Sequence, residues 1–335
     1  MILDRRALLK QAVVGSTLAL AAPSLVRATG SADDIRIGYL HTLAVDGQIW
    51  LADMKGYWQA QGLRPTFYRF YTGLQIFQAM VGGSIDILST GAVISNFPAR
   101  GQGKVFLAND VEFATAQLWV NPKLGVTSYA DLKGKKIATS VGTTADVFLY
   151  TALKAHGLQP GVDVTIINQS MNNAVTSFIA GAVPAVALWV PFNIQVEKNL
   201  PAAKMLDDAS KYYPQAAIVD GWAARNDFYD KHKDILDRVI KAWLPANHDL
   251  ITDTDASLKL LQEKQYADLS LEELRSQFKA EKLFTEKQWV KLYKDGTLTK
   301  WLQRVTDIYT HIGGISNALS ASEYFDPNLF LQAVQ

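Results

Sequence analysis

Gly142, Thr143, Thr144 and Asp146 stand where an apolar strand pattern ends and a helical pattern begins. The start of a helix has free backbone N–H groups and about half a positive charge, so it can bind an anion such as a sulfonate or a carboxylate. The glycine lets a ligand approach the backbone, and the two hydroxyls can donate further hydrogen bonds. These residues therefore predict an anion site. Helix capping is the alternative, because Thr143 and Asp146 have nearly the spacing of a capping box, and for Asp146 it is the preferred interpretation.

The other candidates follow from the rule that ligands of open α/β sheets lie beyond the carboxyl ends of the strands. Applied along the chain, the rule selects as ligand-binding residues His41, Asp46, Gln48, Tyr71, Thr72, Gly73, Thr90, Trp119, Trp189, Phe192, Asp220 and Trp222. Structural alternatives stay open: capping for Thr72 and Gly73, core packing for each tryptophan, and a hinge turn for Asp220. His41 is expected to make a hydrogen-bonding contact rather than to act as a catalyst.

The chemistry of these candidates is mixed in charge. Three carboxylates, Asp46, Asp146 and Asp220, fall on the predicted cleft loops, and the tryptophans are expected near them. Carboxylates and aromatic faces favour a cationic group. A zwitterion such as taurine would use both the anion site and this acidic, aromatic set. A purely cationic solute, such as a guanidinium or a quaternary amine, would use only the second set.

Strand and helix patterns alternate from about residue 35 to residue 225. This alternation predicts an α/β fold with mostly parallel sheets that are covered on both faces. Two such blocks lie on either side of Leu118–Pro122, and long amphipathic helices follow residue 226. A return of the chain through Ala216–Arg225 would give two crossings between lobes, which form a hinge with a ligand cleft beside it. We expect rotation about Trp119–Asn121 and Asp220–Gly221.

The first 28 residues have the pattern of an export signal. Arg5 and Arg6 precede an apolar run at residues 12–22, and small residues lie before a cleavage site after Ala28. The run is too short to span a bilayer, which needs roughly 20 apolar residues. The arginine pair resembles the twin-arginine export motif, and an ordinary secretory signal is the alternative. Either signal predicts a periplasmic protein.

Composition narrows the function further. The chain has 335 residues, a formal net charge of +1 and no cysteine. This charge gives no field that favours nucleic acid. The lack of cysteine excludes a disulfide framework, a thiolate nucleophile and a lipid-modified N-terminal cysteine. The five histidines lack the spacing of a metal site, and there is no G-x-S-x-G motif. We therefore expect no catalytic residue, no metal and no cofactor.

Five segments between residues 34 and 240 resemble, in order, the periplasmic solute-binding proteins of the nitrate, sulfonate and taurine class of ABC importers. These segments are IRIGYL, YTGLQIFQAMVGGSIDILSTG, YADLKGKKIATSVGTTADVFLYTALKAHGL, AVTSFIAGAVPAVALWVP and GWAARNDFYDKHKDIL. The resemblance implies a type II periplasmic binding protein fold with one lobe from residues 34–119 and 222–335 and a second from residues 121–220. It also favours ligand contact for Gly142 and Thr144.

The same resemblance implies a binding protein that captures one small polar solute, such as taurine or an alkanesulfonate, and delivers it to an ABC permease in the inner membrane. We expect a monomer and no enzymatic activity. The alternatives are a binder of a small organic cation such as guanidine, and a solute sensor that docks on a receptor. A third is an enzyme similar to the pyrimidine synthase of thiamine biosynthesis, against which the lack of cysteine argues.

Overall fold

Two sheets of five strands form the framework of residues 32–335, the part of the chain that this computed structural model describes. The first sheet has the strand order β2-β1-β3-β10-β4. Its strands are β1 (Asp33–Leu40), β2 (Leu63–Phe70), β3 (Ile87–Thr90), β4 (Lys104–Val111) and β10 (Val219–Ala224). β1 pairs in parallel with β2 and β3, whereas β10 lies antiparallel between β3 and β4.

The second sheet has the order β7-β6-β8-β5-β9 and a similar design. Its strands are β5 (Ala116–Val120), β6 (Lys136–Thr139), β7 (Thr165–Asn168), β8 (Ala185–Trp189) and β9 (Lys204–Asp208). β6 is parallel to β7 and β8, and β5 is antiparallel to β8 and β9. Each sheet therefore has parallel strands built from strand–helix repeats. Each also has one antiparallel strand, β10 in the first sheet and β5 in the second, which begins where the chain has just crossed from the other lobe.

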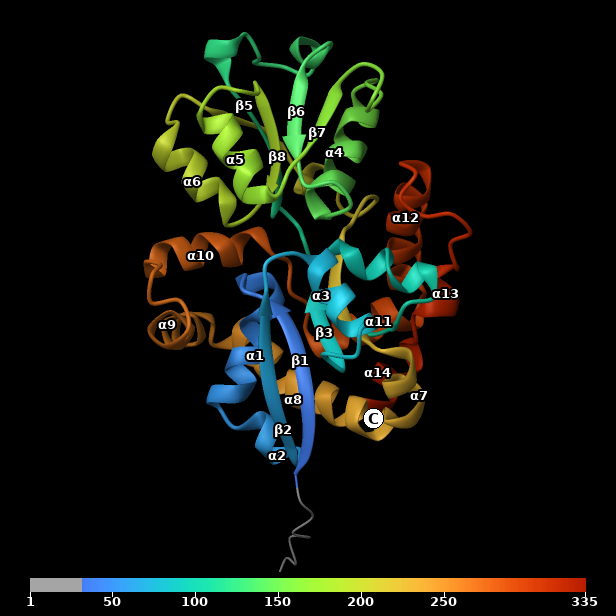
Figure 1. Ribbon diagram of the computed structural model, residues 1–335. Coiled ribbons are helices and arrows are strands. Elements are labelled where there is room, and N and C mark those ends of the chain that lie inside the picture. The colour runs from blue at the N-terminus through green and yellow to red at the C-terminus, as the bar shows by residue number, and fades with distance from the viewer. Residues whose placement is uncertain (1–31) are drawn as a thin grey trace, which may run out of the picture. The chain divides into compact units, whose positions relative to one another are not determined.

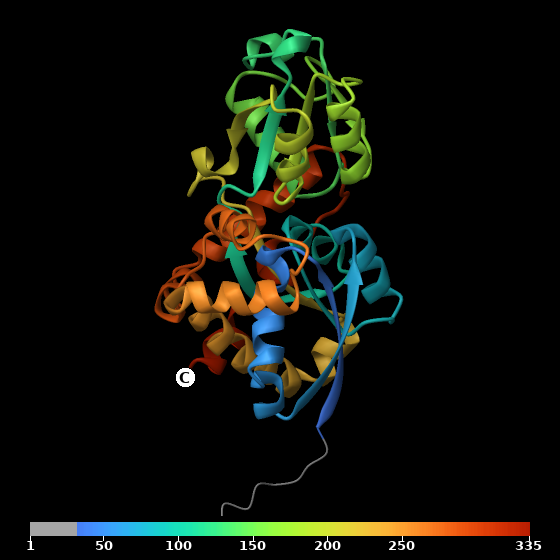
Figure 2. The ribbon, with the colours of Figure 1, turned by 90° about the vertical axis from the view of Figure 1, so that its left-hand side faces the viewer.

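Helices cover both sheets (Figures 1 and 2). The first lobe contains α1 (Leu43–Met54), α2 (Tyr57–Ala60), α3 (Gly73–Val81) and the short 3₁₀ turn η1 (Ala92–Ser95). The second contains α4 (Thr144–Ala155), α5 (Met171–Ile179) and α6 (Phe192–Asn199). The C-terminal helices are α7 (Asn226–Lys231), α8 (Lys233–Thr252), α9 (Thr254–Lys264), α10 (Leu271–Ala280), α11 (Glu286–Lys294), α12 (Thr297–His311), α13 (Ala321–Tyr324) and α14 (Pro327–Ala333). α10 begins with the predicted capping box, since Ser270 and Glu273 exchange side-chain and backbone hydrogen bonds.

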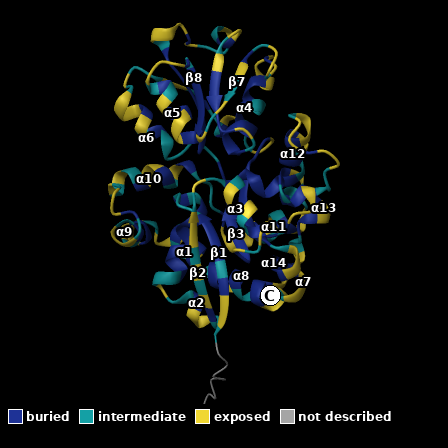
Figure 3. Ribbon diagram, viewed as in Figure 1, coloured by how far each residue is buried: buried dark blue, intermediate teal, exposed yellow. Residues whose placement is uncertain are grey.

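Burial follows these layers. The central strands of both sheets are largely buried, whereas the edge strands β2, β7 and β9 are mostly half-buried or exposed. Further exposed residues lie on the outer faces of the helices (Figure 3). In the first lobe the indole of Trp222 packs beside that of Trp58, and both side chains are fully buried. No helix within residues 32–335 is long and apolar enough to cross a membrane. The predicted export signal and its twin-arginine motif lie outside the described residues.

The two crossings between the sheets lie earlier in the chain than expected. The first runs from Glu112 to Thr115, between β4 and β5, and the second reaches β10 through residues 213–218. They lie side by side, because the Glu112 N–H donates to the Ile218 carbonyl at 2.9 Å. Trp119 is therefore inside the second sheet and Asp220 inside the first, so neither of the predicted rotation points is a free connection. Asp220 is in a strand, not in the hinge turn that was its structural alternative.

The α/β fold with two lobes, two crossings and a helical C-terminal part is confirmed. Two strands, β4 and β9, have no counterpart among the predicted elements. The first matters for function, because Asp110 near the end of β4 and Glu112 directly after it are two positions apart in an extended chain and therefore share one face.

Gly221 is the residue that allows β10 to lie close to β4. A methyl group there would be 2.6 Å from the Leu107 carbonyl oxygen and 2.8 Å from a side-chain carbon of Ile94. We expect Gly221→Ala to lower the free energy of unfolding by about 1–3 kcal/mol, because backbone on the neighbouring strand cannot give way easily. Urea unfolding measures this. Gly47→Ala, where the new methyl would meet only the ends of the Leu43 and Leu250 side chains, is the control. Equal midpoints for wild type and Gly221→Ala would contradict the prediction.

Candidate functional site

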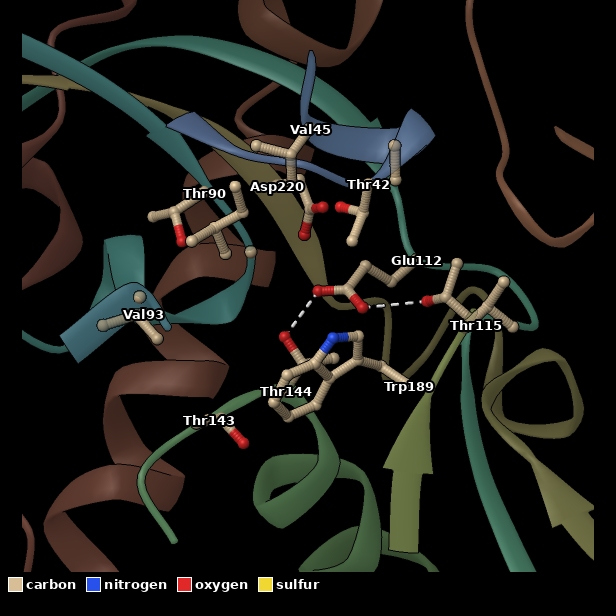
Figure 4. A pocket seen from close by; sticks show the side chains of 15 residues that line it. Thr42, Val45, Thr90, Val93, Glu112, Thr115, Thr143, Thr144, Trp189 and Asp220 are labelled. Atoms are coloured by element: carbon tan, nitrogen blue, oxygen red, sulfur yellow. Dashed lines mark hydrogen bonds between the residues drawn. The ribbon is translucent and has the colours of Figure 1, made fainter. Parts of the chain in front are cut away.

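A small cavity of about 40 Å³ lies where the two lobes and the crossings meet (Figure 4). Its lining comes from the carboxyl ends of β1, β3 and β8, the start of the antiparallel strand β10, the starts of α1, α3 and α4, the turn η1, and the first crossing. The lining residues are Leu40, Thr42, Ala44, Val45, Gly73, Thr90, Gly91, Val93, Glu112, Thr115, Thr143, Thr144, Trp189, Val190 and Asp220. The rule that ligands lie beyond the carboxyl ends of strands therefore points to the observed cavity.

Glu112 joins the parts of this cavity. Its carboxylate accepts hydrogen bonds from the Thr144 hydroxyl at 2.6 Å and from the Thr115 hydroxyl at 2.8 Å (Figure 4). The Thr144 hydroxyl in turn accepts from the backbone N–H of Ala92, in the other lobe, at 3.2 Å. Thr144 thus holds the start of α4 against the first lobe through one donated and one accepted hydrogen bond.

The cavity depends on the absence of a side chain at Gly91. A methyl group there would lie 2.7 Å from both the Glu112 carboxylate and the Thr144 hydroxyl, and 3.2 Å from the Asp220 carboxylate. The polar atoms of three separate segments therefore converge on one glycine. Gly73 is similarly confined, because a methyl there would lie 2.7 Å from a side-chain carbon of Val93 and 2.9 Å from Thr90 Oγ1.

Three acids share one face of the β4–β10 pair. Asp110 is paired directly with Asp220 across the two strands, and Glu112 follows two residues after Asp110. All three are at most 5% exposed. Both oxygens of Asp110 and Oδ1 of Asp220 have no hydrogen-bond partner among the described residues. Of these three acids only Asp220 is among the predicted site residues, although Asp110 and Glu112 alternate in the sequence as residues on one face of a strand do.

The proximity of these acids changes their ionisation. Burial raises the pKa of Asp220 well above its usual range, and the charges of Glu112 and Asp110 raise it further. Burial and the charge of Glu112 likewise raise the pKa of Asp110. Glu281, after α10, adds a fourth carboxyl whose pKa is raised by burial and by Asp110, Asp46 and Glu112. Without a bound cation, the cluster therefore keeps protons at pH values where exposed acids have lost them.

The predicted anion site at the start of α4 is occupied by the protein's own groups. The Gly142 N–H donates to the Asp146 carboxylate at 2.9 Å, and the Thr143 hydroxyl donates to the Ser140 carbonyl at 2.6 Å. Thr144 donates to Glu112, as described above. Asp146 therefore binds the backbone of the residue before the helix N-cap, whereas Thr143 makes no side-chain capping bond, so the predicted capping box is not formed. Burial raises the pKa of Asp146. The positive φ of Gly142, +80°, explains the glycine by backbone conformation alone.

A second, outer cavity of about 310 Å³ shares Leu40, Thr42 and Trp189 with the inner one. It collects several of the predicted site residues: His41, Tyr71, Trp189 and Phe192, together with Arg69, Asn172, Gln195, Tyr266, Asp268 and Gln277. Trp189 and Phe192 pack edge to face, with ring centroids 5.5 Å apart. Tyr71 is 74% exposed, so its ring lies at the entrance rather than in a closed pocket.

Asp46 belongs to a buried network beside this outer cavity. His41 Nδ1 lies 2.7 Å from the Asp46 carboxylate, the Trp50 indole donates to it at 2.9 Å, and the Tyr266 hydroxyl also donates to it. The His41 ring stacks on Tyr266. Asp46 lines neither cavity, because these partners surround it, and it acts on the site by holding His41 and Tyr266.

Four other predicted residues lie away from both cavities. Trp119 donates to Gln117 in the second sheet at 2.8 Å, and Trp222 donates to Asn109 in the core of the first lobe at 3.2 Å. Gln48 accepts from Asn109 at 3.3 Å. Thr72 caps α3 by accepting from the Gln75 N–H. For the two tryptophans and Thr72, the structural alternatives of packing and capping therefore describe what these side chains do.

Comparison with known proteins adds a family to this geometry. Residues 47–257 match the family model described as NMT1/THI5 like. The chain belongs to this family. The resemblance found in the sequence to solute-binding proteins of the sulfonate, taurine and nitrate class is thereby confirmed.

Relatives of this NMT1/THI5-like chain share most of its length. A candidate binding protein of Brucella abortus (strain 2308) is 26% identical over 88% of this chain and 91% of its own. The taurine-binding periplasmic protein of Escherichia coli (strain K12) is 26% identical over 72% of this chain and 73% of its own. The structure of the alkanesulfonate-binding protein SsuA from Xanthomonas axonopodis pv. citri has a TM-score of 0.70, 20% identity and coverage of 88% and 98%. The last likeness shows the fold.

Ionisation of the acid cluster gives a test of its geometry. Because the pKa of Asp220 is higher in the folded protein than the unfolded value of about 3.9, its carboxyl costs stability as the pH rises from that value through the folded pKa. We expect Asp220→Asn to raise the melting temperature at pH 8 and to lose this advantage progressively toward pH 4, as followed by thermal unfolding.

Asp207 is a matched control of opposite sign. Burial tends to raise its pKa, but hydrogen bonds from Tyr129, Tyr212 and Lys211 outweigh this and lower it. Asp207→Asn should therefore destabilise the protein above about pH 4, with the loss disappearing as the pH falls below that value. If the melting temperatures of the two variants, relative to wild type, changed with pH in the same direction, the raised pKa of Asp220 would be contradicted.

Proposed function

We propose that this protein is the solute-binding component of an ABC importer, which captures one small solute between its lobes and delivers it to a permease in the inner membrane. The observation that carries the proposal is the inner cavity, whose lining comes from both lobes and from the crossing between them. A solute placed there touches both lobes only when they are together, so its binding energy favours the closed arrangement. Membership of the NMT1/THI5-like family supports this function.

Closure has an identifiable contact of its own. Thr144 moves with the second lobe, whereas Ala92 belongs to the first and Glu112 begins the crossing. Rotation about the paired crossings would break these hydrogen bonds and open the cavity. The solute then stabilises a closed state that the protein already forms with its own groups, so opening and release remain possible after docking on the permease.

The names of the relatives suggest first candidates for the solute. Taurine and alkanesulfonates are named for the relatives and the solved structure compared above. Taurine is the better candidate of the two, because its ammonium group suits the acids of the inner cavity. A periplasmic location, export by the twin-arginine route and a monomeric state complete the proposal.

Two other functions stay as alternatives. The sensor would have the same site and a receptor in place of the permease, and deletion of the gene with uptake and sensing both measured separates them. For the enzyme, the chain offers no cysteine, and within residues 32–335 no group of three or more histidine, aspartate or glutamate side chains is arranged so that it could hold a metal ion. Turnover of a bound solute by the purified protein would favour the enzyme.

A thermal-shift screen tests the capture of a solute. Because a ligand that binds only the folded state raises its stability by RT ln(1 + [L]/Kd), a concentration of about 100 times Kd adds about 2.7 kcal/mol. We expect one chemical class among taurine, alkanesulfonates, nitrate, guanidine, small amines and pyrimidines to raise the melting temperature. X-ray scattering with that solute should then show closure. If no class raised the melting temperature, the proposal would be contradicted. It would also be contradicted if the free protein were open and its radius of gyration did not decrease at a saturating concentration of solute.

Thr144→Val tests the contact that closes the lobes. The valine has the same shape but no hydroxyl, so Glu112 loses a donor and the Ala92 N–H loses its acceptor. A hydrogen bond to a charged group contributes about 1.5–3 kcal/mol, so we expect solute affinity measured by calorimetry to fall roughly tenfold or more. Thr144→Ser, which keeps the hydroxyl, should stay close to wild type. Equal losses in both variants would assign the effect to packing and not to this contact.

A further inference from the structure

The lining of the inner cavity has acidic side chains but no basic side chain. Two of its fifteen lining residues, Glu112 and Asp220, are acids, and none of the fifteen is lysine, arginine or histidine. Figure 4 shows the Asp220 carboxyl directed toward that of Glu112. Buried carboxylates are normally paired with a cation or a metal. Here the described residues provide no such partner within the lining, so a bound solute is the remaining source of positive charge.

A second observation, independent of the acids, also indicates a ligand that donates hydrogen bonds. Thr90 lines the cavity and is completely buried, and its Oγ1 has no hydrogen-bond partner among the described residues. Oδ1 of Asp220, which is 1% exposed, is likewise without a partner. Leaving such atoms without a partner costs free energy. Both oxygens can accept hydrogen bonds, and Gly91 leaves open the space beside Asp220.

The groups that would bind an anion are engaged elsewhere. The Gly142 N–H and the Thr143 and Thr144 hydroxyls donate to Asp146, Ser140 and Glu112. An anion at the start of α4 would displace these contacts and would lie next to Glu112. A cation would instead keep every one of them, because Glu112 has further lone pairs beyond the two that Thr144 and Thr115 use.

Size and aromatic lining define the cation further. A volume of about 40 Å³ holds roughly three water-sized groups, so only the head of a solute fits. Trp189 lines both cavities, and its indole is the aromatic ring to which a cation binds best. The rest of the solute would extend past Trp189 into the outer cavity.

We propose that the solute enters with a small organic cation foremost, a guanidinium or primary ammonium group whose N–H groups donate to Glu112, Asp220 and Thr90 beside the indole of Trp189. This inference rests on the proposed function and specifies its substrate class. A zwitterion such as taurine satisfies it, with its ammonium group in the inner cavity and its sulfonate in the outer cavity near Arg69. An alkanesulfonate without an amino group does not.

Calorimetry with defined probes tests the charge of the solute. The probes are guanidinium, propylammonium, taurine, ethanesulfonate and nitrate at millimolar concentration, with sodium chloride at the same ionic strength as a blank. We expect at least one probe with a cationic nitrogen to bind. Glu112→Gln and Asp220→Asn should each weaken it about ten- to hundredfold. Asp207→Asn, which removes a buried carboxylate of the second lobe outside both cavities, should leave the affinity unchanged.

The pH dependence of binding gives a second measurement that needs only the wild-type protein. A cation favours the ionised forms of Asp220, Asp110 and Glu281, so its binding releases protons and its affinity rises with pH until these acids of the free protein are ionised. A purely anionic solute would take up protons, and its affinity would fall over the same range. Calorimetry in buffers of different ionisation enthalpy counts these protons directly.

The outcomes separate the two proposals. Binding of ethanesulfonate or nitrate without any cationic probe, or proton uptake on binding, would overturn the cation while keeping the solute-binding function. Cation binding that survives both acid substitutions would overturn the assigned site. If none of the five probes bound in calorimetry and the pyrimidines gave no thermal shift, both the cationic solute and the solute-binding function would be contradicted. The inference is supported if binding to the wild type releases protons, and if Glu112→Gln and Asp220→Asn lose binding while Asp207→Asn keeps it.

Discussion

The constraint on which the site depends is the placement of Asp110, Glu112 and Asp220 on one face of two neighbouring antiparallel strands. Side chains opposite each other on such strands are about 5 Å apart, so these carboxyls cannot avoid one another. Burial excludes the water that would otherwise screen them, which is why the pKa values of Asp110 and Asp220 rise. A core designed for stability alone would place apolar residues at these positions. Their presence is explained if a positively charged guest completes the site.

The chain leaves the first lobe at the end of β4 and returns to it at the start of β10. Glu112 stands at the first residue after β4, and its N–H bonds to the residue just before β10. Its side chain meanwhile reaches Thr144 at the start of α4. One residue therefore belongs to the hinge by its backbone and to the site by its side chain. Any change in the charge around Glu112 acts directly on the contact that brings the lobes together, with no need for a longer path between site and hinge.

The sequence was sufficient for the fold and for part of the site. Strand–helix alternation and turn residues are local signals, and they indicated the two blocks, the existence of two crossings though not their positions, and the strand ends that carry Gly73, Thr90, Thr144 and Trp189. It was not sufficient for the acid cluster, because Asp110 and Glu112 end an apolar run, VFLANDVEF, that no predicted element included. It also left binding and capping open at Thr72, and it did not show that the Thr143 hydroxyl donates to the Ser140 carbonyl. Those roles depend on which backbone groups a side chain reaches, and that geometry is not encoded in spacing.

The position of β10 between β3 and β4 has a consequence for biosynthesis. The second sheet is built from a continuous stretch, residues 116–208, and all its pairings can form once that stretch has been made. The first sheet cannot close until residues 219–224 emerge, since β3 and β4 have no partner on their facing edges before then. The lobe that begins the chain is thus the later one to mature. Its exposed strand edges during that interval are where chaperones, or misassociation with other nascent chains, would act.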